Sequence, residues 1–312
     1  MVVDAHAHVI VPGLGADIRW EDGAQVVDFE GRSIRSAVRE LVDLERILQE
    51  QDRAGVDMVV LCPWVTLLGR EPARQNEMLA AMVGERVAAL GTIHLEHPDG
   101  LVELMGDGRL AGVEVAASYD GDYLGAERFE DFWAAAEETR ALIFIHPTTR
   151  GFDQPVFDDF YLWNAVGNPL ETTVTAAHMV MAGVLERHPR LRVLLAHGGG
   201  ALPALRGRLR HAHSFQPQAR SRLGESPDDS LSRFYFDTVT HDESLLRELV
   251  ALAGADRVLC GSDYPFDMGV DNPLERLADA GFPPADELAI RGGTAASLFD
   301  LPAPVPTRGA RS

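Results

Sequence analysis

The chain has 312 residues and a formal net charge of −20 at pH 7, with 48 acidic and 28 basic side chains. This acidic balance argues against nucleic acid as a partner, because binding a phosphate backbone requires a basic patch. No apolar stretch approaches the length of a membrane span and no leader-like segment precedes the first predicted strand, so we expect no membrane partner and a cytoplasmic location.

Apolar, β-branched stretches bounded by turn residues recur along the chain and predict eight strands. In chain order they are Val2–Ile10, Val56–Cys62, Val87–Leu95, Gly112–Ala117, Ala141–His146, Leu191–His197, Phe234–Thr240 and Arg257–Asp263. Segments with helical periodicity lie between them, for example Leu44–Arg53, Gln75–Val83, Phe129–Arg140, Thr172–Arg187 and Glu243–Leu252. Strands alternating with helices in this number predict an α/β fold, a (β/α)8 TIM barrel. A doubly wound open sheet is the alternative, but it normally has a Gly-rich turn after its first strand, which Ala-His-Ala-His does not provide.

The length suits one barrel domain, which typically takes about 250 residues plus insertions, so we expect residues 1–312 to form a single domain. The polar stretch 11–39 is too long for an ordinary loop after the first strand. We expect it to be an irregular insertion that folds over the barrel mouth as a cap or lid. The tail 302–312, which holds three prolines, is expected to be mobile unless a partner subunit holds it.

Possible metal ligands stand at the ends of several predicted strands. His6 and His8 lie two residues apart on the first strand and therefore point to the same face. His146 ends the fifth strand and Asp263 ends the eighth, and barrel active sites are assembled at the C-terminal ends of the strands. Three imidazoles and one carboxylate form a ligand set suited to Zn²⁺, with water in an open position, and Mn²⁺ or Fe²⁺ is the alternative.

Two further features narrow the chemistry. His197 is followed by Gly198-Gly199-Gly200, so its backbone can approach the metal closely, and we expect its imidazole to act as an acid–base group rather than as a ligand. A serine esterase would need a G-x-S-x-G elbow, which this sequence lacks. The sequence also contains no lysine, which excludes a Schiff base and a carbamylated lysine between two metals, and so predicts a mononuclear site.

Taken together, four motifs carry a family resemblance: Asp-Ala-His-Ala-His, Phe-Ile-His-Pro, Leu-Ala-His-Gly-Gly-Gly and Gly-Ser-Asp-Tyr-Pro-Phe. From His6 to about Leu301 the chain resembles the amidohydrolase-related decarboxylases of the 2-amino-3-carboxymuconate-6-semialdehyde decarboxylase type. The resemblance implies a metal-dependent barrel enzyme that cleaves a C–C bond without oxidation. It implies zinc at the four ligands named above, with His197 as the acid–base residue.

The resemblance also implies two arginines that bind a substrate carboxylate. Arg35 occupies one such position, and Arg208 matches an arginine that reaches into the active site of the neighbouring subunit, which implies a homodimer. A planar guanidinium suits this role because it binds a carboxylate through two parallel hydrogen bonds. The alternative is that both are ordinary surface arginines.

Other candidates lie in loops near the predicted mouth. Arg150 departs from the family pattern, which has an aromatic residue just after the fifth strand, and it suggests an additional anionic or hydroxylated substrate group. Tyr161 and Trp163 would stack on a flat substrate or pack within their own loop. His241 would line the pocket or hydrogen-bond beside it.

These features predict non-oxidative decarboxylation of an unsaturated or aromatic carboxylic acid as the activity, in which His197 or Asp263 manages the proton that replaces carbon dioxide. Hydrolysis of a lactone or amide, or hydration of a double bond, at the same metal site is the main alternative, because fold-level similarity does not settle the reaction. A barrel retained as a metal-dependent binding protein is the third, and it would be expected to have lost ligands, whereas none is missing here.

Overall fold

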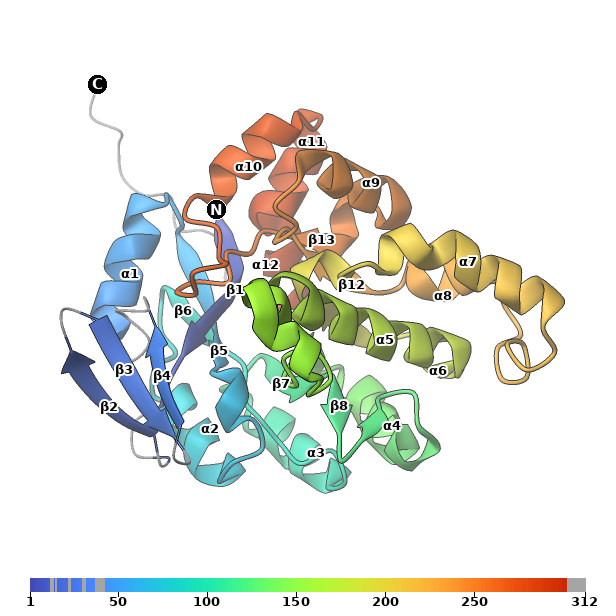
Figure 1. The fold of residues 1–312 in the computed structure, drawn as a ribbon. Helices are drawn as coiled ribbons and strands as arrows, with labels where there is room; N and C mark the ends of the chain where they lie inside the picture. Colours follow the sequence, from blue (N-terminus) through green and yellow to red (C-terminus); the bar gives the residue numbers. More distant parts are fainter. Residues whose placement is uncertain (12–13, 15, 22–23, 30–31, 37–42, 302–312) are drawn as a thin grey trace.

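The computed structural model describes residues 1–301 except 12–13, 15, 22–23, 30–31 and 37–42. Parallel strands occupy the interior and helices lie around them (Figure 1). One sheet has the order β1-β5-β6, with β1 Val3–Val9, β5 Met58–Pro63 and β6 Val87–Ala89. The other has the order β13-β12-β11-β10-β7, with β7 Gly112–Ala116, β10 Leu142–His146, β11 Arg192–Leu195, β12 Tyr235–Asp237 and β13 Val258–Leu259.

Each of the eight predicted strand ranges overlaps one of these strands, with β5 extending one residue beyond its range, and the expected α/β fold with parallel strands is confirmed. Several strands are shorter than predicted, most of all β6 and β13. The two sheets are in contact at both edges. An isolated parallel bridge pairs Gly91, just after β6, with Val113 on β7, and another pairs Ala7 on β1 with Tyr264. The carboxyl ends of β1 and of the segment after β13 therefore lie side by side.

Helices follow most of the strands. In chain order they are α1 Leu44–Arg53, α2 Pro72–Ala80, α3 Pro98–Asp107, α4 Glu130–Thr139, α5 Asn168–Met181, α6 Val184–Arg187, α7 Leu202–Phe215, α8 Pro227–Leu231, α9 Glu243–Ala253, α10 Pro273–Ala280, α11 Pro284–Leu288 and α12 Thr294–Leu298. The prediction for Leu44–Arg53 is confirmed to the residue, and Asp43 caps this helix by accepting from the amide of Arg46. The predicted helix Thr172–Arg187 is divided, because Gly183 has φ 70° and its left-handed backbone separates α5 from α6.

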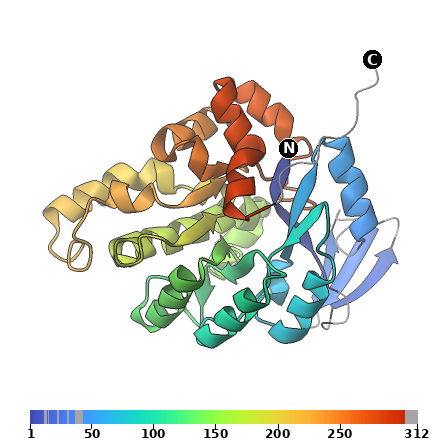
Figure 2. The same ribbon diagram turned by 180° about the vertical axis from the view of Figure 1, so that it is seen from behind.

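Alternating residues on the strands face two different environments. On β10, Ile143 and Ile145 pack outward in a cluster with the helices. Leu142 and Phe144 pack inward, in a cluster to which both parallel sheets contribute buried side chains. Seen from behind, the helices surround this interior on the opposite side as well (Figure 2). His146, at the end of β10, lies at the end of this interior cluster.

The insertion after β1 is not irregular, and that expectation is wrong. It forms a three-stranded antiparallel sheet of β2 Ala16–Glu21, β3 Ala24–Phe29 and β4 Arg32–Ser36. The pairing places Val27 between Ile18 and Ile34, and β-branched residues at facing positions favour a sheet. The sheet lies at the side of the molecule that carries α1 (Figure 1). Its role as a cap stays a prediction, as does the single-domain assignment.

Two further expectations concern the C-terminal tail and the cellular location of the protein. The tail 302–312 lies outside the described residues. Across the part of the chain that is described, none of the helices has the length and apolar character needed to cross a membrane. The cytoplasmic location stays a prediction.

Candidate metal centre

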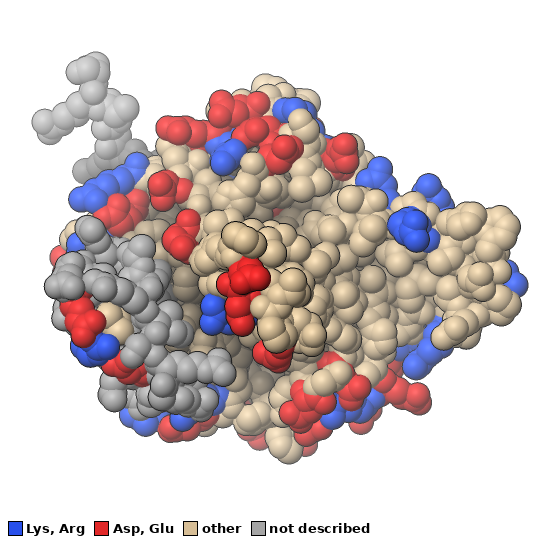
Figure 3. Space-filling view, viewed as in Figure 1, with Lys and Arg blue, Asp and Glu red and all other residues tan. Residues whose placement is uncertain are grey.

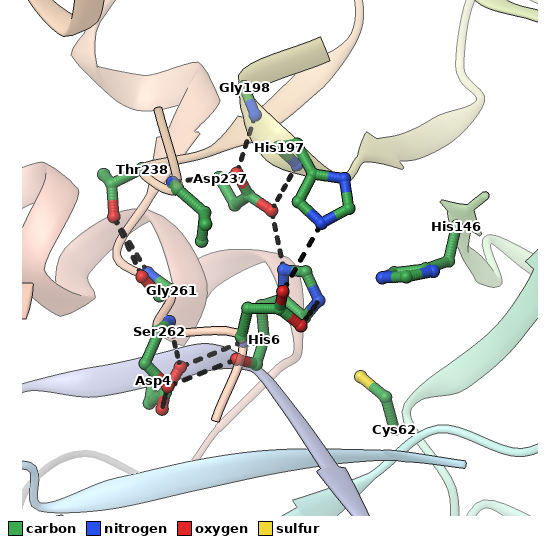
Figure 4. Close-up of polar contacts among 12 residues, drawn as sticks. Asp4, His6, Cys62, His146, His197, Gly198, Asp237, Thr238, Gly261 and Ser262 are labelled. Atoms are coloured by element: carbon green, nitrogen blue, oxygen red, sulfur yellow. Dashed lines mark hydrogen bonds and ion pairs between the residues drawn. The ribbon is translucent and has the colours of Figure 1, made fainter. Parts of the chain in front are cut away.

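The four predicted ligands come together at the carboxyl end of the parallel strands. One possible ligand atom from each of His6, His8, His146 and Asp263 lies within 4.8 Å of the others, and all four side chains are buried. His6 Nε2 lies 3.0 Å from His8 Nε2, and Asp263 Oδ1 lies 3.2 Å from each of these nitrogens. Figure 4 shows His146 facing this group from the far side of the interior.

The ring orientations fit a metal ion. His8 Nδ1 donates to the carbonyl of Pro63 at 3.3 Å, and His146 Nδ1 donates to the carbonyl of Pro147 at 3.0 Å. With the proton on Nδ1, each Nε2 presents a lone pair to the cluster. His146 Nε2 is buried and has no hydrogen-bond partner among the described residues. A buried imidazole nitrogen without a partner is unfavourable, and a metal ion would satisfy it.

The electrostatics of the cluster differ between its histidines. Burial opposes protonation of His6, but the carboxylates of Asp263 and Asp237 raise its pKa to about 10, so a bound metal ion would have to displace a proton there. Burial lowers the pKa of His8, and burial together with the neighbouring His8 and His197 lowers the pKa of His146 well below its usual value. These two shifts favour the neutral ring, the form in which histidine binds metals. Burial opposes ionisation of Asp263, but the adjacent His6 and hydrogen bonds from the histidines hold its pKa well below the usual range.

His197 lies beside the four ligands rather than among them. It follows β11, its Nε2 is 3.5 Å from Asp263 Oδ2, and its ring centroid is 5.1 Å from that of His146. Its side chain is 11% exposed, so protons can reach it from solvent. The backbone of His197 has φ 57°, and Gly198, Gly199 and Gly200 also have positive φ. A Cβ at Gly200 would lie 2.0 Å from the carbonyl oxygen of Pro169, so only glycine fits there.

Two buried aspartates support the cluster and were not predicted. Asp237 at the end of β12 accepts from His6 Nδ1 at 2.7 Å and from the amides of His197 and Gly198 at 2.9 and 2.7 Å (Figure 4). Asp4 on β1 accepts from Ser262 Oγ at 2.5 Å and from the Ser262 amide at 3.0 Å, next to Asp263. The sequence marks both residues only as acids inside apolar predicted strands. An acidic side chain is rarely buried without a structural role.

Glu114 on β7 is a third buried acid that was not predicted. Both of its carboxylate oxygens are buried without a hydrogen-bond partner in the described part of the structure. Its neighbours Val113 and Val115 pack outward, so Glu114 faces the interior. Burial raises the pKa of Glu114 well above its usual value, which favours a neutral carboxyl group.

Two of the predicted substrate-binding residues contact the segment that follows Asp263, and two more pack beside one of them. The guanidinium carbon of Arg150 lies 3.9 Å from the ring centroid of Trp163, and the ring of Tyr161 packs edge-on against the same tryptophan. Tyr161 donates to the carboxylate of Asp267 at 2.8 Å. His241 contacts the carbonyl oxygen of the next residue, Met268, at 2.8 Å. The structure thus groups these residues, and their contact with substrate stays a prediction.

The other two arginines lie elsewhere. Arg35 is on β4, where its backbone pairs with that of Val26. Arg208 is exposed on α7, a helix that extends away from the strands (Figure 1). Arg208 does not belong to the buried cluster, and the side chain of Arg35 lies outside the described part of the structure.

Comparisons with known proteins agree with the fold. The profile of the family described as Amidohydrolase matches residues 3–301, so the chain belongs to the amidohydrolase family. A 2-amino-3-carboxymuconate-6-semialdehyde decarboxylase of Dictyostelium discoideum is 28% identical over 259 residues, covering 77% of this chain and 72% of the relative. A gamma-resorcylate decarboxylase of Rhodococcus jostii is 27% identical over 257 residues, covering 73% of this chain and 76% of the relative. The crystal structure of a dihydroxybenzoic acid decarboxylase from Polaromonas with bound manganese superimposes with a TM-score of 0.79 at 19% identity, covering 96% of this chain and 97% of that one. The predicted family is confirmed.

Proposed function

We propose that this protein is a metal-dependent decarboxylase that releases carbon dioxide from an aromatic or otherwise unsaturated carboxylic acid without oxidation. The observation that carries the proposal is the convergence of three imidazoles and one carboxylate, with a fourth, partly accessible imidazole at their edge. Support comes from relatives named as decarboxylases of carboxymuconate semialdehyde and resorcylate, which match about three quarters of the chain.

The proposed architecture is a single domain formed by a closed (β/α)8 barrel, with the sheet β2-β3-β4 as a cap. Closure is supported by hydrogen bonds across both edges of the parallel sheets. The amide of Ala5 donates to Cys260 at 2.8 Å on one side, and the amide of Glu114 donates to Gly91 at 2.8 Å on the other. In such a barrel the cluster lies at the end where catalytic residues are found.

The metal is proposed to be zinc, bound by His6, His8, His146 and Asp263. The nitrogen and oxygen donors suit zinc, and manganese is the alternative because a structural neighbour contains it. When bound, the ion supplies a positive charge that polarises a substrate oxygen and stabilises negative charge as the bond breaks.

The proton transfer is assigned to His197. As the bond to the carboxylate carbon breaks, its electron pair stays on the substrate carbon, and that carbon takes a proton from His197 Nε2 in place of carbon dioxide. Asp263 Oδ2, at 3.5 Å, orients the imidazole. We assign Arg150 to an anionic or hydroxyl group of the substrate, and Tyr161 and Trp163 to the ring of the substrate.

The proposed assembly is a homodimer in which Arg208 enters the site of the partner subunit and Arg35 binds the same carboxylate. The surface over α5 and α7 supports it. Phe215 on α7 is 67% exposed and Phe160, between β10 and α5, is 92% exposed. Figure 3 shows this face as largely uncharged, with arginines along α7. Exposed large apolar side chains are typical of protein interfaces.

The test measures metal content and then carbon dioxide release from a panel of aromatic and muconate-type acids, using zinc-loaded protein. We expect about one metal per subunit and release by the wild type. His197→Ala should retain the metal and lose the release. His97→Ala, which changes an exposed histidine outside the cluster, is the matched control and should behave as the wild type.

Three results would contradict parts of the proposal. Loss of metal in His197→Ala would make His197 a ligand. Metal binding without release from any acid would favour lactone or amide hydrolysis, or hydration of a double bond, at the same site. A monomer in solution would exclude the role of Arg208 in the partner's site.

A further inference from the structure

Asp237 receives hydrogen bonds from both halves of the proposed active site. It lies at the carboxyl end of β12, which is between β11 and β13 in the sheet. From there its carboxylate reaches His6 on β1 and the backbone after β11, where His197 lies. We propose that Asp237 is a positioning residue that couples the metal ligand His6 to the acid–base residue His197. The inference rests on the proposed function and adds to it a residue whose loss would disturb metal binding and proton transfer together.

On the metal side, Asp237 distinguishes His6 from the other two histidine ligands. His8 and His146 are each held through Nδ1 by a backbone carbonyl oxygen, a neutral acceptor. His6 Nδ1 instead donates to Asp237 Oδ2 at 2.7 Å, with both side chains fully buried. A carboxylate partner fixes the proton on Nδ1 and makes the opposite nitrogen a stronger ligand. His6 is therefore the histidine whose affinity for the metal depends on a charged neighbour.

On the His197 side, Asp237 holds an uncommon backbone conformation. His197 and Gly198 are successive residues with φ 57° and 60°. Their amides point to the same carboxylate, at 2.9 Å to Oδ2 and 2.7 Å to Oδ1. Successive amides that converge in this way form a site for an anion. Residues other than glycine rarely adopt a positive φ, so the backbone of His197 is strained. Hydrogen bonds to the Asp237 carboxylate offset this strain, and the conformation places the His197 ring beside Asp263.

A group with acceptor atoms only is suited to this double role. A third amide, that of Val239, donates to Oδ1 at 3.0 Å, so four donors surround one buried carboxylate. In Asp237→Asn one carboxylate oxygen becomes an NH2 group, which cannot accept a hydrogen bond. If the NH2 faces His6 Nδ1, the imidazole proton moves to Nε2, the metal-binding nitrogen. If it faces Gly198, the backbone amide there loses its acceptor.

The test compares Asp237→Asn with the wild type and with a control, Asp242→Asn. Asp242 is on the same loop and caps α9 by accepting from Leu245, a role that asparagine performs equally well. The first measurement is zinc affinity by competition with a chelator. We expect Asp237→Asn to weaken binding by about 10- to 100-fold, the usual effect of losing such a partner, and Asp242→Asn to leave it unchanged.

The second measurement is kcat and KM at saturating zinc. We expect kcat of Asp237→Asn to fall by about 100-fold while KM changes little, because a misplaced acid–base group slows the chemical step. Full recovery of kcat at saturating zinc would overturn the coupling and leave Asp237 acting on His6 alone. Unchanged zinc affinity would show that Asp237 does not support the metal ligand His6.

A second variant tests the His197 side if Asp237→Asn does not fold. A Cβ at Gly198 would lie 2.6 Å from Thr240 Cγ2, so Gly198→Ala moves the backbone of His197 without touching His6. It should lower kcat and leave zinc affinity intact, and an unchanged kcat would refute the positioning of His197. If the wild type releases no carbon dioxide, the proposed decarboxylation fails, but the zinc titration still decides whether Asp237 supports His6.

Discussion

Glu171 on α5 holds the loop that follows His146, and its substitution gives a sharp test of the hydrogen bonding there. The side chain is buried, and its Oε2 accepts from the amides of Thr148 and Thr149 at 3.0 and 2.8 Å and from the Thr149 hydroxyl at 2.8 Å. Its Oε1 accepts from Ser118 Oγ at 3.2 Å. One carboxylate thus satisfies two backbone amides next to a metal-ligand candidate.

The structure predicts very different costs for two substitutions of Glu171. In Glu171→Ala both amides lose their acceptor, and each unsatisfied group costs about 1–3 kcal/mol. Because these amides are only partly buried, we expect a total of about 2–4 kcal/mol. In Glu171→Gln the side-chain carbonyl replaces Oε2, and its NH2 donates to Ser118, whose hydroxyl can also accept. Burial raises the pKa of Glu171, so the charge itself is disfavoured, and we expect a cost of about 1 kcal/mol.

The assay is urea unfolding at fixed excess zinc, with the zinc affinity of each folded variant measured alongside. The free energy of unfolding should fall slightly for Glu171→Gln and strongly for Glu171→Ala, and only the alanine variant should bind zinc less tightly. Glu138→Gln, at an exposed position on α4, is the control and should match the wild type. Equal losses for the glutamine and alanine variants would refute the reasoning, since they would mean that charge rather than acceptance of hydrogen bonds holds the loop.

Three further predictions test the surface, the mouth and the metal. Hydrogen bonds from Arg187 and His188 lower the pKa of Glu130 to about 2, below its unfolded value, so Glu130 stabilises the fold above about pH 4.5 and loses this effect as the pH falls towards 2. After allowance for exposure, Glu130→Gln should cost no more than about 1 kcal/mol at pH 7, and a difference from wild type that stays constant down to pH 2 would contradict this. Tyr161→Phe removes the hydrogen bond to Asp267 between two loops at the mouth. KM should rise while the unfolding temperature hardly changes, and an unaltered KM would argue against a role of Tyr161 at the mouth. Removing the metal with a chelator should lower the unfolding temperature, and adding zinc should restore it, because an ion that binds the folded state stabilises that state. An unchanged unfolding temperature would show that the metal does not stabilise the fold.

The grouping of the four candidate ligands was predictable because the relevant information is local. A histidine pair on one face of a strand and polar residues directly after other strands are visible in the sequence, and the parallel arrangement of the strands brings them to one edge. Asp237 was not predictable in the same way. Its contact with His6 joins residues 231 positions apart, and an acid within an apolar stretch does not indicate which strand it will face.

The insertion shows a different limit. Residues 16–21 read Ala-Asp-Ile-Arg-Trp-Glu, an alternation of apolar and charged residues with the period of a strand. The high polarity of the whole stretch conceals this period and predicts an irregular segment, whereas the backbone forms three strands. The proposed substrate arginines are harder still to predict, because nothing local distinguishes a functional arginine from the many others in the sequence. An arginine that acts in a partner subunit also depends on a surface that a single chain does not contain.

The contact between β1 and the segment after β13 has a consequence for how the protein is made. Asp4 and Ser262, which lie beside the ligands His6 and Asp263, are 258 residues apart in sequence. At a synthesis rate of about 5–20 residues per second, the histidine pair leaves the ribosome tens of seconds before the aspartate. A nascent or truncated chain therefore carries the imidazoles without the carboxylate that completes the set. The proposed set of four ligands is complete only after Asp263 has been synthesised, so loading of the ion would report on synthesis of the chain as far as this residue.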